Sequence, residues 1–160
     1  MGTALWNGSR RTAELVADIP APAADAWALL NDWAGILRWW PANGPIDIVD
    51  VTLGGARDAL PRSRHIRMAN GTVGIETLLL ADPIAMRIYY DLENGGIPVV
   101  RNYLASTTID PIDAQRCRMT FSSRFDVLDE ADAPFAEQIV GAVYAAIRDG
   151  FSAYFTRAVA

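Results

Sequence analysis

The first strong pattern in the chain is an alternation of apolar and polar residues between residues 11 and 19, which predicts a half-buried strand. Two prolines end this strand, because proline cannot donate a hydrogen bond to a neighbouring strand. Residues 21–45 then change to helical spacing, with apolar residues three or four positions apart. Pro41, Gly44 and Pro45 stop this segment, which we interpret as two short helices broken near Gly35.

From there to residue 129 the pattern predicts six strands separated by turns rich in glycine, asparagine and proline. A long amphipathic helix follows over residues 132–159, and Gly150 suggests a bend in it. The expected strands cover residues 46–55, 62–69, 72–81, 85–94, 101–109 and 115–129, and the expected buried face of the helix holds Phe135, Ile139, Val143, Ile147 and Tyr154.

This order of elements predicts an α+β fold in which a curved, seven-stranded antiparallel sheet wraps around the long C-terminal helix. One face of such a sheet must be covered, and the long helix is the element available to cover it. A single helix cannot fill a strongly curved sheet, so we expect a ligand-sized cavity between the two.

The composition narrows the class of protein. A chain of 160 residues with 51% hydrophobic residues, 21% charged residues and a net charge of -5 suits one globular domain over residues 1–160. The fourteen basic residues, all arginine, are scattered, which argues against nucleic-acid binding. One cysteine and one histidine exclude an intramolecular disulfide and a multi-histidine metal site.

No apolar run has the length of a signal peptide or a membrane span, so we expect a cytoplasmic protein without integral membrane association. The absence of lysine beside abundant alanine and arginine suggests a bacterial gene rich in G and C. No phosphate-binding loop, nucleophilic triad or metal cluster is visible, and no cofactor is expected.

The hairpin around Asn70 and Gly71 carries the only histidine. Asn-Gly favours a two-residue type I′ turn, and that turn would place His65 opposite Glu76, with Cβ atoms about 5 Å apart. A buried imidazole and carboxylate at that distance could act as an acid/base pair.

The apolar pattern of the same hairpin supports an alternative. It assigns the other face to the core, which leaves His65, Arg67 and Glu76 in water as an ordinary exposed cluster. The apolar residues of that face are Ile66, Met68, Val73 and Ile75.

Three segments and the order of elements resemble the START/Bet v 1-like (SRPBCC) superfamily. The segments are "DAWALLNDWAGILRWWPANGP", "NGTVGIETLLLAD" and "GGIPVVRNYLASTTIDP". Within the superfamily the chain is similar to bacterial polyketide cyclase/dehydrase-like proteins and to plant abscisic-acid receptors, over about residues 12–154. The resemblance implies a helix-grip fold with a cavity for a hydrophobic ligand.

The resemblance to the receptors also implies positions for the site. Residues 68–72 would form a gate and residues 97–101 an apolar latch over the cavity mouth, which gives a reason for the apolar run after the Gly95-Gly96 turn. The implied pocket residues are His65, Glu76, Tyr90, Leu92, Val100, Tyr103, Ala105, Ser122, Phe135, Ile139 and Val143.

Three features depart from the receptors or leave alternatives open. The lysine that pairs with the hormone carboxylate has no counterpart in this chain, so abscisic acid is not expected as the ligand. On the last strand the resemblance turns Ser122 inward, whereas the apolar pattern turns Phe121 inward. Trp39 could contact the ligand or close the end of the sheet as part of the core.

Two main functions are compatible with these observations. The first is binding of a small hydrophobic ligand such as a lipid, an isoprenoid or an aromatic polyketide-like molecule. The second is a cofactor-independent cyclase or dehydratase (lyase), with His65 and Glu76 as the acid/base pair and Tyr103 polarising a carbonyl. A third possibility is that the apolar latch is a protein contact, and the chain would then be a homodimer rather than a monomer.

Overall fold

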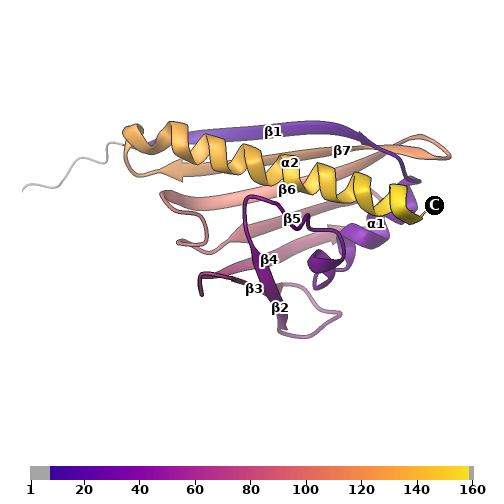
Figure 1. Ribbon diagram of the computed structural model, residues 1–160, viewed down its shortest axis with the longest axis horizontal. Helices are drawn as coiled ribbons and strands as arrows, with labels where there is room; N and C mark the ends of the chain where they lie inside the picture. The colour runs from indigo at the N-terminus through magenta and orange to yellow at the C-terminus, as the bar shows by residue number, and fades with distance from the viewer. Residues whose placement is uncertain (1–7, 159–160) are drawn as a thin grey trace, which may run out of the picture.

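Seven antiparallel strands form one sheet in the computed structural model, which describes residues 8–158 (Figure 1). The strand order is β1-β7-β6-β5-β4-β3-β2, so β1 crosses over to pair with the last strand. The expected seven strands, two short helices and long C-terminal helix are confirmed. Their bounds are β1 Ser9–Ile19, α1 Ala23–Asn31, η1 Gly35–Arg38, β2 Ile48–Gly54, β3 Arg62–Met68, β4 Val73–Asp82, β5 Arg87–Leu92, β6 Val100–Asp113, β7 Arg116–Val127, η2 Glu130–Asp132 and α2 Ala133–Ala158.

Two expectations extend beyond the described residues. The domain expected over residues 1–160 includes residues 1–7 and 159–160, and the expected long helix extends to residue 159. Within the described chain, no helix is long and apolar enough to cross a membrane.

Helix α2 covers one half of the sheet, along β1, β7 and β6 (Figure 1). Val140, Tyr144 and Phe151 on the helix, together with Phe121 and Phe125 on β7, are at most 1% exposed. The other half of the core comes from the segment between β1 and β2, which buries Leu29, Leu30, Trp33, Ile36 and Trp39. The expectation that the long helix alone covers the sheet is therefore incomplete.

The buried face of α2 is rotated from the one expected. Ala136, Val140 and Tyr144 are buried at its centre, whereas Phe135 is 48% exposed and Ile139 is half-buried. The expected face starts one residue before the buried one, at Phe135 rather than Ala136, and one residue is about 100° around a helix with 3.6 residues per turn. The series that begins at Ala136 therefore packs on the sheet, whereas Phe135 faces solvent.

Gly150 has a steric role in this packing. A Cβ atom at this position would lie 2.2 Å from the carbonyl oxygen of Trp39. The lack of a side chain lets α2 approach the backbone of the segment after η1, which holds Trp39 against the sheet. The sequence suggests a bend at this glycine, and the close backbone contact is a separate reason for glycine at this position.

Candidate functional site

The β3–β4 hairpin turns through three residues rather than two. The Met68 N–H donates to the Thr72 carbonyl at 2.9 Å, and the Gly71 N–H donates to the Met68 carbonyl at 2.9 Å. Gly71 has φ +86°, a conformation that glycine adopts without the steric cost of a Cβ atom. The three loop residues 69–71 therefore shift the register by one residue from the expected two-residue turn.

This shift changes which residue faces Glu76. Arg64 pairs with Glu76 in the ladder, and His65 pairs with Ile75 on the outer face. The prediction that His65 opposes Glu76 and lines the cavity is wrong. The imidazole instead lies close to Gly54, where a Cβ atom would be 3.1 Å from His65 Nε2.

Each of the two alternatives for this hairpin is correct for one strand. On β3 the apolar pattern holds, because Ile66 is 7% exposed and faces inward. On β4 the resemblance holds, because Gly74 is buried, Glu76 lines the cavity, and Val73 is 47% exposed. A mixed outcome of this kind is what a shift of one residue in register produces.

Arg64 and Glu76 form an ion pair in the cavity wall. Arg64 Nε donates to the Glu76 carboxylate oxygen Oε2 at 2.6 Å, and one terminal nitrogen of Arg64 lies 2.5 Å from the same oxygen. The two side chains are 8% and 17% exposed. The guanidinium also lies over the ring of Trp33, 3.8 Å from its centroid, and donates to the Trp33 carbonyl at 3.3 Å. These contacts fix the plane of the guanidinium and neutralise its charge within the fold.

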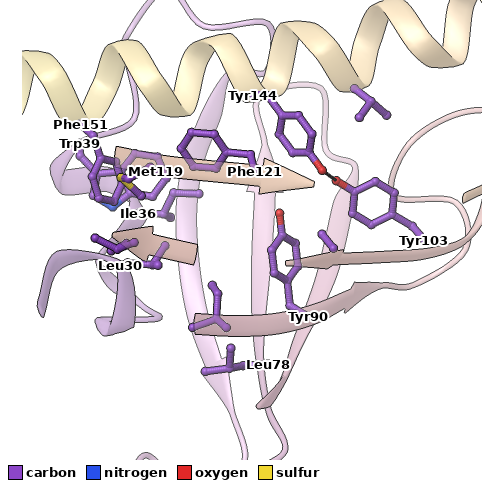
Figure 2. Close-up of a cluster of buried hydrophobic side chains, with 14 of the residues drawn as sticks. Leu30, Ile36, Trp39, Leu78, Tyr90, Tyr103, Met119, Phe121, Tyr144 and Phe151 are labelled. Carbon is purple, nitrogen blue, oxygen red and sulfur yellow. Dashed lines mark hydrogen bonds between the residues drawn. The ribbon is translucent and has the colours of Figure 1, made fainter. Parts of the chain in front are cut away.

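Three tyrosines bring their hydroxyl groups together beside this pair. The hydroxyls of Tyr103 and Tyr144 are 3.1 Å apart, and the Tyr90 hydroxyl points toward them (Figure 2). Burial raises the pKa of all three phenols, so they remain protonated at neutral pH. The cluster therefore offers neutral O–H groups whose protons can be donated.

A cavity of about 50 Å³ lies between the sheet and α2, and Arg64, Glu76, Tyr90 and Tyr103 line it, whereas Tyr144, which is on α2, does not. Its walls come from the segment around η1, from β2 to β6, from the loop before β6, and from α2. Apart from the polar cluster its lining is almost entirely apolar. The lining residues are Ile36, Trp39, Trp40, Ile46, Ile48, Arg64, Ile66, Met68, Gly74, Glu76, Tyr90, Leu92, Gly96, Ile97, Tyr103, Val143 and Ile147.

Six of the predicted site residues line this cavity. They are Trp39, Glu76, Tyr90, Leu92, Tyr103 and Val143. Trp39 is also 4% exposed and packs edge-on against Phe151 at 4.8 Å between ring centroids. The two alternatives for Trp39, ligand contact and core packing, are thus compatible.

The other predicted site residues lie elsewhere. Val100 and Ala105 are buried in the core without lining the cavity, and Ile139 lines a separate surface groove. Phe135 is exposed on α2 because of the rotated helix face. Ser122 is on the outer face of β7, since Phe121 and Ser123 face inward with 1% and 6% exposure. The apolar pattern is therefore correct for β7.

Sequence reasoning missed Arg64, the residue that pairs with Glu76. A charged residue in an alternating strand is normally assigned to solvent, so composition gave no signal for it. A three-residue turn would have placed Arg64 opposite Glu76, but the dipeptide Asn-Gly does not by itself specify a turn of three residues. Among residues 8–158, no cluster of three or more histidine, cysteine, aspartate or glutamate side chains could hold a metal ion.

The family model "Polyketide cyclase / dehydrase and lipid transport" matches residues 10–156. The chain belongs to this family. The comparison confirms the resemblance noted from the sequence, and the seven-stranded sheet with its long C-terminal helix is the helix-grip fold of Bet v 1-like proteins.

Solved structures show the same fold at low sequence identity. A Thermobifida fusca protein is 26% identical, with a TM-score of 0.71, and the match covers 89% of this chain and 94% of that one. XoxI from Bacillus cereus is 18% identical, with a TM-score of 0.76 and coverage of 91% and 95%. Norcoclaurine synthase from Thalictrum flavum, solved with dopamine and hydroxybenzaldehyde, is 18% identical, with a TM-score of 0.73 and coverage of 98% and 94%. Among curated proteins, no significant match was found.

Proposed function

We propose that this family member binds a small, largely apolar ligand, such as an isoprenoid, a lipid or an aromatic polyketide-like molecule, in the cavity between the sheet and α2. The supporting observation is a largely apolar cavity whose polar side chains gather on the side of the sheet, at Arg64, Glu76, Tyr90 and Tyr103. Such a lining binds the apolar body of a ligand by burial and orients it by a few hydrogen bonds.

Ligand access passes through the segment after Gly95. Ile97 is 7% exposed and lines both the cavity and a groove of about 400 Å³ at the surface, which also contacts Met68 and Asn70. A cavity of about 50 Å³ holds a few water molecules at most, since one needs roughly 10–15 Å³ measured this way. A larger ligand therefore requires displacement of Ile97, as expected if residues 97–101 act as a latch and residues 68–72 as a gate.

The first test is native mass spectrometry of the protein purified from its own host, followed by extraction of any bound molecule. A stoichiometric apolar molecule would support the proposal and identify the ligand class.

A second test uses the neutral fluorescent probe N-phenyl-1-naphthylamine and two matched variants. Val143→Trp fills the cavity and should abolish binding, whereas Val16→Trp, on the exposed face of β1, should leave binding unchanged. Thermal melting of both variants checks that each is folded. The proposal fails if the wild-type protein binds neither the probe nor any member of a broad apolar library.

A cyclase or dehydratase activity is the second candidate. The hydrogen bond and the close ion-pair contact from Arg64 both go to Glu76 Oε2, and among residues 8–158 no hydrogen bond reaches the other oxygen, Oε1. A carboxylate oxygen beside protonated phenols can accept a proton from a carbon next to a carbonyl, while Tyr103 donates a hydrogen bond to the carbonyl oxygen. His65 has no part in this version, because it lies on the outer face.

The activity can be tested by proton exchange at the methyl group of 2-acetylnaphthalene in deuterium oxide, followed by NMR. General acid/base catalysis typically contributes about 10²- to 10⁴-fold, so Glu76→Gln should reduce the enzyme-dependent exchange by that order. His65→Ala is the matched control and should leave it unchanged. Exchange no faster than in buffer would exclude this chemistry for aryl ketones and leave the binding proposal intact.

A further inference from the structure

The polar wall of the cavity contains a cation that is already neutralised. Arg64 uses Nε and one terminal nitrogen on Glu76, and its other terminal nitrogen donates to the Trp33 carbonyl. The guanidinium is held over Trp33 and cannot turn toward a ligand without breaking these contacts. The wall therefore lacks the free positive charge that would compensate a buried ligand carboxylate.

The same wall carries two phenol hydroxyls, those of Tyr90 and Tyr103. Tyr103 also shares one hydrogen bond with Tyr144, which does not line the cavity, and this bond uses the proton of only one hydroxyl. The Tyr90 hydroxyl points to the same place (Figure 2). Protonated phenols that converge in a buried site favour a ligand atom that accepts hydrogen bonds, such as a carbonyl oxygen.

Glu76 does not compensate for the missing cation. It is the partner of Arg64, so the pair is neutral overall, and Glu76 itself offers only hydrogen-bond acceptors. A ligand carboxylate would have to lose its hydration without finding an unpaired cation. A neutral ketone avoids the cost of burying an unpaired charge.

We infer that the cavity selects ligands with an uncharged carbonyl group, placed at the Tyr90 and Tyr103 hydroxyls, over ligands of the same shape that carry a carboxylate. This selectivity rests on the proposed ligand-binding function and narrows its ligand class to neutral carbonyl compounds such as aryl ketones. Free fatty acids and other apolar carboxylates are then poor ligands at neutral pH.

The test compares 2-acetylnaphthalene with 2-naphthoate at neutral pH, each displacing N-phenyl-1-naphthylamine from the protein. The two molecules share a ring system and differ in the charge of one substituent. We expect the ketone to bind at least about tenfold more tightly, a difference of about 1.4 kcal/mol. Equal affinities, or tighter binding of the naphthoate, would overturn the inference while the bound probe would still support the proposed function.

Two variants examine the cause of the selectivity. Glu76→Gln removes the charge that neutralises Arg64 and leaves the guanidinium free to pair with a ligand carboxylate. The affinity for naphthoate should then rise by about tenfold, and the preference for the ketone over naphthoate should narrow or reverse. Tyr103→Phe removes one donor, so ketone affinity should fall by about five- to tenfold while naphthoate affinity changes little. Tyr89→Phe, on the outer face of β5, is the matched control and should change neither.

The outcomes separate the two levels of the proposal. A wild-type protein that binds no neutral probe contradicts ligand binding itself, and the selectivity falls with it. A protein that binds the probe but keeps the same ketone-to-naphthoate ratio in Glu76→Gln and Tyr103→Phe contradicts the selectivity alone. If circular dichroism shows that Glu76→Gln is unfolded, the ratios for wild type and Tyr103→Phe decide the question.

Discussion

The half of the sheet under α2 and the β3–β4 hairpin follow different rules of residue placement. On β7 the inward positions hold Met119, Phe121 and Phe125, each at most 1% exposed, and the expected alternation is kept. On the hairpin the inward positions include Arg64 and Glu76. A strand that packs against a helix is selected for apolar area, whereas a strand that faces a cavity is also selected for polar groups that contact a ligand.

The difference shows how the placement of residues on a strand can reveal a ligand site. Inward-facing charge is costly unless it is paired, and the Arg64–Glu76 pair satisfies this condition at the edge of the cavity. The departure from alternation is therefore itself the signal of a site. It becomes visible only when the register of the hairpin is known.

The largest expected effect is in the packed half. Phe121→Ala removes a fully buried ring that stacks on Tyr144 at 5.9 Å between centroids, and it should lower the free energy of unfolding by about 3–5 kcal/mol. Phe135→Ala makes the same chemical change at a 48% exposed position and should cost under about 1 kcal/mol. Urea denaturation of both variants measures the contrast. Equal losses would show that α2 does not pack as described.

The next effect is in the hairpin. Arg64→Met leaves Glu76 without its partner and should lower the free energy of unfolding by about 2–4 kcal/mol, because a largely buried charge loses its counter-ion. Arg118→Met breaks an ion pair with Asp18 whose two side chains are 51% and 47% exposed, and it should cost at most about 1 kcal/mol. The double variant Arg64→Met with Glu76→Leu should recover most of the loss. No recovery would mean that the guanidinium stabilises the fold through Trp33 alone.

Much of the fold could be predicted from periodicity. The β1 strand alternates strictly, and the order of seven strands, short helices and a long helix allowed one plausible layering. The rotation of α2 could not be read with the same accuracy. Alanine contributes little to an apolar pattern, so the pattern favours the larger Phe135 over Ala136, although Ala136 is the buried residue.

The site could be predicted only in part, because the position of one pair of residues depends on the length of a single turn. Tyr90 and Leu92 follow the phase of Ile88, so their inward orientation could be derived from β5 itself. Glu76 came from the family resemblance, and Arg64 depended on a turn of three residues rather than two. A choice between two turns that differ by one residue is decided by packing on both faces of the hairpin, which no local pattern records.

A smaller effect tests how α2 contacts the chain near Trp39. Gly150→Ala places a methyl group 2.2 Å from the Trp39 carbonyl oxygen, and we expect a net loss of about 1–2 kcal/mol after the gain in helix propensity. Gly141→Ala has no atom within 4 Å of the new Cβ and should stabilise the protein by about 0.5–1 kcal/mol. Thermal unfolding of both variants should give opposite signs. The same sign at both positions would contradict the close backbone contact.

The smallest effect concerns a set of contacts among β1, β6 and β7, in the half of the sheet under α2. Asp126 on β7 accepts hydrogen bonds from Arg10 at 2.9 Å and from Asn102 at 2.8 Å, and these bonds, with the Arg10 bond the stronger cause, lower the pKa of its carboxyl group. Asn102 has φ +52° at the irregular start of β6, next to the loop that carries Ile97.

The sign of the pH dependence follows from this lowered pKa. An unfolded aspartate has a pKa of about 3.9, so the contribution of Asp126 to stability is complete at neutral pH and is lost as the pH falls from about 4 through the lower folded value. Asp126→Asn should therefore melt at a lower temperature than wild type at pH 7, and the difference should shrink below pH 4. A difference that stays constant with pH would assign the effect to the shape of the side chain rather than to its charge. Because Arg10 is exposed, we expect this effect to be the weakest of the four, and its main consequence should be looser anchoring of the loop over the cavity.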